Sequence, residues 1–311
     1  GVVGLRPSYG LVPYTGLAAT EMTMVAVGPL ANSVEDIARA LNVLAGPDSL
    51  DPRQRGIVPP DVDYLSSIGT GAAKARIAVV RESFNQAPWR DLGLPGSERV
   101  VDQKVRAALE RLRASGATVE EVSVPAHLDG VHVFNAMYNE GNAAMVLANA
   151  VGTNFMGYYN TELMEAYGRS WRSDPNSLSP ARKSVLITAE FLRRRYHGRY
   201  YAQAQNVRDR IRAGYDEVLK RYDVMATPTV PFRATPIPPA DLPPDKNVAY
   251  AMQMIANTCQ SGVTGHPAIS VPCGISDGLP IGLQIIGRHL DDWTVLRIAD
   301  AIERLGDWQT F

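Results

Sequence analysis

Apolar residues recur at the spacing of an α-helix between residues 33 and 46, which is the clearest single element in the sequence. The side chains that would face a core lie three and four residues apart: Val34, Ile37, Ala38, Leu41 and Leu44. Ser33 precedes them as an N-cap with Asp36 in the capping position, and Gly46 followed by Pro47 ends the pattern. The proline-rich, charged residues 46–64 predict a surface loop that cannot build a core.

A strand–helix–strand pattern comes next in the chain. Residues 76–80 form a short apolar run suited to a buried strand, residues 97–116 place apolar side chains on one helical face, and residues 117–125 alternate in polarity. Parallel strands need a long crossover of this kind. The pattern therefore predicts a βαβ unit with a right-handed crossover.

Residues 128–222 are predicted to be mostly helical, without a clear strand. Arginines and tyrosines are frequent in residues 190–222, and such residues together can bind phosphate and stack on bases. Acidic residues interrupt this run from Asp209 onward, and the whole chain is slightly acidic. We therefore favour a solvated helix surface over a nucleic-acid site.

The remaining sequence predicts a mixed sheet. Residues 222–232 indicate a buried strand that runs into a proline-stiffened loop, and a helix is expected around residues 247–262. Two apolar, β-rich runs then flank residues 276–278, which is typical of a hairpin. A final helix should begin after Asp291 and end before Gly306. Parallel and hairpin-paired strands interleaved with helices predict an α/β fold, with a mixed β-sheet flanked by helices on both faces.

Composition narrows the range of functions. The chain has 311 residues, 45% of them hydrophobic and 20% charged, which is ordinary for a globular protein. Its net charge of −1 gives no reason to expect nucleic acid or an anionic membrane as a partner. No apolar run approaches the roughly 18 residues that span a bilayer. Cys259 and Cys273 form no disulfide framework, which fits a cytoplasmic location.

The residues alone identify no catalytic or metal site. Residues 274–278 match the G-x-S-x-G nucleophile pattern, but that motif requires a strand that turns into a helix, and a strand-like run follows here. The five histidines show no spacing typical of metal ligands, so we assign no metal site. Both cysteines lie in apolar surroundings typical of buried structural thiols. Taken alone, these features predict only an α/β domain.

Five motifs, in order along the chain, carry more information than any one of them. They are GVVGLRPSYGLVPYTG, GPLANSVEDIARALNVLAGPDSLDPRQ, YDVMATPTVP, NTCQSGVTGHPAISVPCG and GLPIGLQIIGRHLDD. Together they resemble the amidase signature family of amide hydrolases over essentially the whole chain. Within that family the chain is most similar to the broad-specificity amidases of bacterial nitrile-degradation pathways, because of segments such as LVPYTG, DPRQ and VTGHP.

The resemblance implies a serine hydrolase of the Ser–cis-Ser–Lys type that uses no metal or organic cofactor. Its second serine attacks the amide carbonyl and forms an acyl-enzyme that water hydrolyses. In the family these residues precede the motif that begins at Gly1, so we expect residues 1–311 to be the C-terminal part of a single amidase signature domain, with 128–222 as a mostly helical insertion. No catalytic residue is assigned, Ser8 is expected to be structural, and this chain alone is predicted to be inactive.

By the same resemblance, five residues are expected to contact a small-molecule amide substrate. They are Thr227, Pro228, Gln284, Ile285 and Ile286. An equally weighted alternative is that Ile285 and Ile286 are ordinary core residues of a central strand. Asn257 matches the family pattern but is expected to maintain the fold, and the first glycines are expected to let the backbone turn tightly.

Two alternatives to a free-standing amidase stay open. One is the amide-hydrolysing subunit of a tRNA-linked glutamine amidotransferase, which would need protein partners and tRNA. The other is a non-catalytic subunit completed by a separate N-terminal chain. A homodimer is a further expectation for the intact protein, and the isolated chain should expose unpaired strand edges and be poorly soluble.

Overall fold

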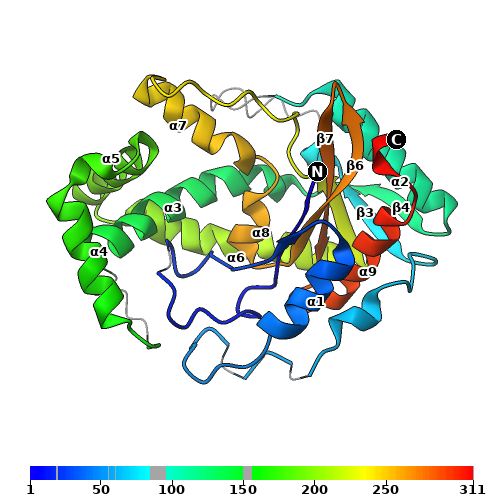
Figure 1. The fold of residues 1–311 in the computed structure, drawn as a ribbon, viewed down its shortest axis with the longest axis horizontal. Coiled ribbons are helices and arrows are strands. Elements are labelled where there is room, and N and C mark those ends of the chain that lie inside the picture. The colour runs from blue at the N-terminus through cyan, green and yellow to red at the C-terminus, as the bar shows by residue number, and fades with distance from the viewer. Residues whose placement is uncertain (19, 55, 60, 85–95, 150–155, 311) are drawn as a thin grey trace.

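The strands pair into one sheet at the centre of the molecule (Figure 1). The computed structural model describes residues 1–311 except 19, 55, 60, 85–95, 150–155 and 311. In this part of the chain the sheet has seven strands, in the order β2-β1-β6-β7-β5-β3-β4. Their bounds are β1 Val3–Arg6, β2 Leu30–Ala31, β3 Arg76–Val80, β4 Thr118–Val122, β5 Val224–Pro228, β6 Ala268–Ser276 and β7 Leu279–Gly287.

The sheet is mixed, as the sequence predicted. Strand β3 pairs in parallel with β4 and with β5, and helix α2 (Arg99–Ala114) connects β3 to β4. The other pairs are antiparallel. The βαβ unit is therefore confirmed as a neighbouring parallel pair with its crossover helix.

Strands β6 and β7 form the predicted hairpin. Asp277 and Gly278 make its turn with φ values of 51° and 76°, the left-handed conformation that a two-residue turn needs and that glycine adopts without strain. Ser276 is the last residue of β6, and the chain after the turn enters another strand. The nucleophile-elbow interpretation of residues 274–278 is excluded because no helix follows the serine.

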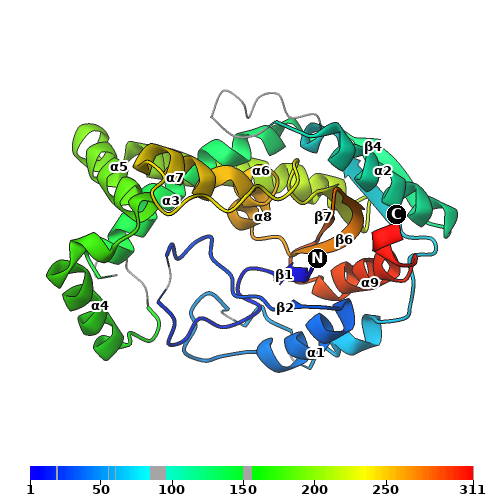
Figure 2. The same ribbon diagram turned by 45° about the horizontal axis from the view of Figure 1, so that its top comes forward.

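Helices cover both faces of the sheet, and successive strand residues divide between two hydrophobic clusters. One cluster joins the sheet to α1 (Val34–Leu44), α2 and α9 (Asp292–Glu303). The other joins the opposite face to α3 (Gly130–Leu147) and α6 (Arg199–Leu219). Figure 2 shows α1 and α9 on one side of β6 and β7, with α6 on the other. The predicted α/β architecture is thus confirmed.

Helix α1 agrees with its prediction except at its last residue. The Ser33 hydroxyl accepts a hydrogen bond from the backbone N–H of Asp36, and the four preceding members of the apolar stripe are buried. Leu44 was expected to face the core but is 41% exposed. Leu44 is the last residue of α1 and lies beyond the part of the helix that packs against the sheet. Asp291 caps α9 in the same way, accepting from the backbone N–H of Thr294.

Most of residues 128–222 are helical in the part that the structure describes. The helices there are α3, α4 (Thr161–Ser173), α5 (Pro180–Tyr196) and α6. Figure 1 places α4 and α5 at the end of the molecule opposite β3 and β4. Whether this region is an insertion into a single domain stays a prediction. No helix in the described residues is long and apolar enough to cross a membrane.

The helix expected around residues 247–262 is interrupted. Helix α7 spans Pro244–Met252, a short 3-10 turn follows, and α8 spans Cys259–Thr264. The break lies beside Asn257, whose carbonyl oxygen accepts a hydrogen bond from the Gln284 side chain. A tertiary hydrogen bond replaces a helical one at this point, and helical periodicity could not reveal it.

The opening segment is a strand, which the sequence did not predict. Gly4 lies in β1 with extended backbone, so the expectation of a tight turn at the first glycines is wrong there. A Cβ on Gly4 would lie 2.7 Å from Cδ2 of Leu30 on the neighbouring strand β2. Gly4 therefore permits close packing between strands. The left-handed turns come later, at Gly10 and Gly16, with φ values of 86° and 82°.

Candidate functional site

Three of the predicted substrate-binding residues lie where β5 and β7 pair. Thr227 is directly opposite Gln284, and Pro228 is the next residue along β5. The Gln284 side-chain amide donates to the Thr227 hydroxyl over 2.9 Å and to the carbonyl oxygen of Asn257 over 2.9 Å. Thr227, Pro228 and Gln284 are all buried. The strand pairing thus brings these residues together, and their contact with a substrate stays a prediction.

Ile285 and Ile286 lie on opposite faces of the sheet. Ile285 packs in the cluster with α1, α2 and α9, whereas Ile286 packs in the cluster with α3 and α6. Both side chains are fully buried. Because neighbouring strand residues point to opposite faces, these two cannot line one pocket together. In this structure both have the environment of core residues, and a role for either in binding substrate is untested.

Asn257 connects the ends of several elements at this site. Its Nδ2 group donates to the carbonyl oxygens of Ser83, over 3.1 Å, and Pro228, over 2.9 Å. Its Oδ1 atom lies 3.1 Å from Nε2 of His127. The side chain is fully buried, so these contacts are shielded from water. Asn257 therefore fixes the carboxyl end of β5, next to the predicted substrate-binding residues.

His127 completes this network as a neutral ring. With Asn257 Nδ2 committed to two carbonyls, Nε2–H of His127 donates to Asn257 Oδ1. The Tyr215 hydroxyl then donates to Nδ1 over 2.8 Å. Burial lowers the pKa of His127 to about 4, so the ring is uncharged at neutral pH. Both ring nitrogens are engaged, which gives His127 a structural role.

Ser8 is also structural in its contacts. It joins the segment after β1 to the start of α9, where its backbone N–H and its hydroxyl donate to the two carboxylate oxygens of Asp292. The backbone N–H of Leu290 donates to the Ser8 hydroxyl over 2.7 Å. Burial raises the pKa of Asp292 to about 6. Both sides of the Ser8 hydroxyl are thus engaged in buried structural contacts, which agrees with the expectation that Ser8 is not a nucleophile.

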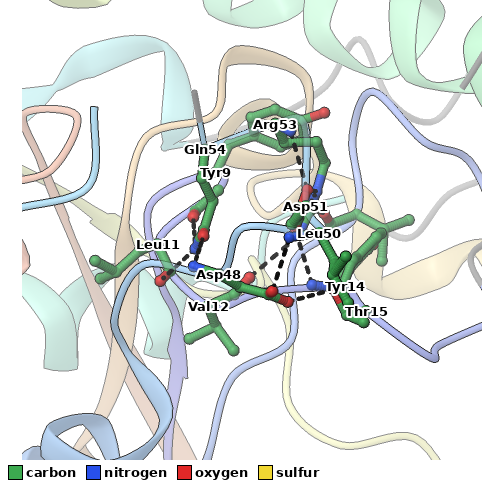
Figure 3. A network of polar contacts seen from close by, with 12 residues as sticks. Tyr9, Leu11, Val12, Tyr14, Thr15, Asp48, Leu50, Asp51, Arg53 and Gln54 are labelled. Carbon is green, nitrogen blue, oxygen red and sulfur yellow. Dashed lines mark hydrogen bonds and ion pairs between the residues drawn. The ribbon is translucent and has the colours of Figure 1, made fainter. Parts of the chain in front are cut away.

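The loop expected to lie on the surface instead contains a buried polar cluster (Figure 3). The Arg53 guanidinium forms an ion pair with Asp51 and lies 3.5 Å from the ring centroid of Tyr14. Asp51 accepts from the backbone N–H of Tyr14 over 2.8 Å. The Gln54 side chain donates to the carbonyl oxygen of Gly10 over 2.8 Å. The prediction for residues 46–64 is therefore wrong at Asp51, Arg53 and Gln54, and also at Val58 and Tyr64, which belong to the hydrophobic core.

The prediction failed because it took the charged side chains of this segment to be exposed. Charged and amide side chains can be buried when each is paired, and local sequence does not show the partner. The side chains of Arg53 and Asp51 are 5% and 0% exposed; they pair with each other, and the backbone groups of Tyr14 and Val12 that they also contact lie about forty residues earlier in the chain. The cluster holds residues 9–15 in place through contacts with Arg53, Asp51 and Gln54.

Leu17, Ala18, Thr20 and Met22 form one wall of a pocket with an open mouth. The pocket has a volume of about 160 Å³ and lies between this segment and helices α3, α4 and α5. Its apolar and aromatic lining side chains are Leu17, Met22, Met145, Val146, Leu163, Met164, Tyr158, Tyr159 and Tyr167. None of the five predicted substrate-binding residues lines it.

A second hollow adjoins this pocket and differs in charge. The two share Met22 and Met145, but the second is also lined by Glu21 and Glu140. Glu21 is 2% exposed and accepts a hydrogen bond from the Tyr201 hydroxyl over 2.9 Å. Burial raises the pKa of both carboxyl groups. The sequence analysis missed both hollows. Their walls combine an irregular segment with faces of several helices, and the periodicity of apolar residues does not show how these helices lie relative to one another.

The described residues contain no group of histidine, cysteine, aspartate and glutamate side chains able to hold a metal ion. Cys259 and Cys273 are buried and unpaired, and burial raises the pKa of each thiol. Their environment is that of structural thiols, as the sequence predicted.

The model of one protein family, described as Amidase, matches residues 1–296. That span includes the whole sheet, the Asn257 network and both hollows. The chain belongs to the amidase family. As an amidase-family chain, it has the mixed sheet and helical layers expected from the five motifs.

Relatives of this amidase-family chain include two kinds of protein. An enantioselective amidase of Rhodococcus rhodochrous is 40% identical over 310 residues, which cover 99% of the chain and 58% of that protein. A glutamyl-tRNA(Gln) amidotransferase subunit from Bacillus velezensis is 34% identical, with coverage of 99% and 60%. The crystal structure of the corresponding subunit from Thermotoga maritima has a TM-score of 0.73 and 30% identity, and the match covers 98% of this chain and 58% of that one. The chain thus spans less than two thirds of the length of these relatives.

Proposed function

We propose that the protein containing this chain hydrolyses small aliphatic or aromatic amides to a carboxylic acid and ammonia. In this proposal a serine attacks the carbonyl, ammonia leaves, and water hydrolyses the acyl-enzyme. The Ser–cis-Ser–Lys set belongs to the part of the family's length that precedes Gly1. Residues 1–311 supply the sheet that supports this set and the pocket for the rest of the substrate.

The observation that carries the proposal is the 40% identity with an enantioselective amidase over 310 residues. The amidotransferase subunits are 33–34% identical over nearly the same span. The pocket adds support, because its mainly apolar lining suits the hydrocarbon part of an amide. A role in nitrile degradation, suggested by the LVPYTG and DPRQ segments, remains part of the proposal.

The amide-hydrolysing subunit of a tRNA-linked amidotransferase is the second candidate. It is favoured by the Thermotoga structure, which matches 98% of the chain with a TM-score of 0.73. Such a protein would release ammonia from glutamine and deliver it within a complex. A homodimer and a cytoplasmic location are further proposals for the amidase.

The test uses the complete coding sequence and measures ammonia release. The purified protein should release ammonia from propionamide and benzamide without any partner or tRNA. Replacement of its upstream nucleophilic serine by alanine should abolish release, and hydroxylamine should trap the acyl group as a hydroxamate. Ammonia release from glutamine alone, dependent on partner subunits, would instead support the amidotransferase.

A further inference from the structure

The pocket lined by Leu17 and Met22 is mainly apolar and has one cationic side chain in the part of its wall that the structure describes. Among the described residues that line it, Arg182 is the one with a formal charge. Its guanidinium donates to Oδ1 of Asn142 over 2.5 Å, and it forms no ion pair with any carboxylate in the described part of the chain. An arginine that lines an apolar pocket without a carboxylate partner is a strong site for an anion.

The position of Arg182 in its helix strengthens this charge. Arg182 lies in the first turn of α5, and its backbone N–H donates to the hydroxyl of the N-cap residue Ser179. The N-terminal turn of a helix carries a partial positive charge. The positive helix end and the guanidinium therefore act at the same wall of the pocket.

Three buried polar groups without partners among the described residues lie in or near the pocket: Asn149 lines it, Asn142 accepts from Arg182, and Trp171 packs behind it. Asn142 is fully buried, and its Nδ2 group has no partner among the described residues. Trp171 Nε1 and Asn149 Oδ1 are likewise buried without a partner there. Trp171 packs against the apolar cluster that contains Val146, and Val146 and Asn149 line the pocket. Buried polar atoms without partners are costly and call for an explanation, such as a ligand that supplies the missing contacts.

Charge is separated between the pocket and its neighbour. Glu21, Glu140 and Glu190 line the second hollow together with Arg193, so among the described residues its acidic side chains outnumber the basic one, and none of these four residues lines the pocket that contains Arg182. An anionic group would be repelled from the carboxylates and attracted to the guanidinium. The arrangement therefore fixes the orientation of a ligand that carries a negative charge at one end.

We propose that this pocket binds a carboxylate attached to an apolar, aromatic-sized body, with Arg182 as the residue that recognises the charge. The inference rests on the proposed function, because it takes the ligand of this pocket to be the amide substrate. It adds that such substrates carry a carboxylate distant from the amide group. Arg182 acts in this proposal as a specificity-determining residue and takes no part in bond breaking.

The test measures binding to the complete protein with ligands that cannot be hydrolysed. The probes are 4-acetylbenzoate and its uncharged analogue 4-methylacetophenone, titrated by calorimetry at low salt. We expect 4-acetylbenzoate to bind at least about tenfold more tightly. The Arg182→Gln variant should lose this preference, and Arg182→Lys should retain part of it because it keeps the charge without the forked geometry.

Arg169→Gln is the matched control. Arg169 is 72% exposed on α4, pairs with Glu165 and does not line the pocket, so its replacement should leave the preference unchanged. Equal affinity for the two probes, absence of binding by both, or a preference that survives in Arg182→Gln would each overturn the proposal. If Arg182→Gln fails to fold, the comparison of the two probes on the unmodified protein still decides.

Binding and turnover separate this inference from the proposed function. Tight binding of 4-acetylbenzoate by a protein that hydrolyses no amide would support the pocket assignment and contradict the amidase. Hydrolysis of benzamide with no preference for the carboxylate probe would support the amidase and overturn the pocket assignment.

Discussion

Replacement of Asn257 by alanine tests the network that fixes the end of β5. The change would leave three buried partners unpaired: the carbonyl oxygens of Ser83 and Pro228, and Nε2–H of His127. An unpaired buried group costs about 1–3 kcal/mol, and water that enters the vacated space can recover part of this. We therefore expect a loss of about 3–5 kcal/mol, a large fraction of the roughly 5–15 kcal/mol typical of a domain.

Urea unfolding followed by circular dichroism measures this loss in free energy of unfolding. The exposed Asn176, which accepts a hydrogen bond from Lys183, provides a control, and Asn176→Ala should change stability by less than about 0.5 kcal/mol. Asn257→Asp sharpens the test because it keeps the shape but removes both donors. At pH 7 it should be at least as harmful as alanine, since its charge would face two carbonyl oxygens. A cost below about 1 kcal/mol for Asn257→Ala would refute the proposed importance of this residue.

Two further substitutions test other contacts. The pKa of Asp292 is about 6 in the folded chain, against 3.8 for the free side chain. Below pH 4 this difference stabilises the folded state by about 3 kcal/mol. The contribution is lost as the pH rises through 6. An amide can accept only one of the two hydrogen bonds from Ser8, so Asp292→Asn should destabilise the protein, but by less at pH 8 than at pH 5 in thermal melts. An equal effect at both pH values would contradict the assigned pKa. A Cβ on Gly282 would lie 2.8 Å from the hydroxyl oxygens of Ser270 and Thr229, so Gly282→Ala should lower the melting temperature by several degrees.

The sequence predicted those elements whose signals are local. Helix α1 has its cap, its apolar stripe and its terminating glycine close together in the chain, and the β6–β7 hairpin has its turn at Asp277-Gly278. Both were therefore correct apart from Leu44. The order of five motifs was enough to identify the family, because it uses information from the whole chain at once.

The missed features depend on partners distant in the chain. Strand β1 is short and pairs with β6, more than 260 residues later. The burial of Asp51 depends on Tyr14, 37 residues earlier, as well as on the neighbouring Arg53, and the break before α8 depends on Gln284. The pocket around Arg182 likewise needs the relative placement of one loop and three helices. Composition and periodicity carry none of this information.

The central claim is that the protein containing this chain hydrolyses small amides by itself. Its most direct test is ammonia release from benzamide by the protein expressed from the complete coding sequence, without partner subunits or tRNA. We predict release that stops when the upstream nucleophilic serine is replaced by alanine. A well-folded protein that releases no ammonia from benzamide or propionamide, but does so from glutamine once partner subunits are added, would contradict the claim.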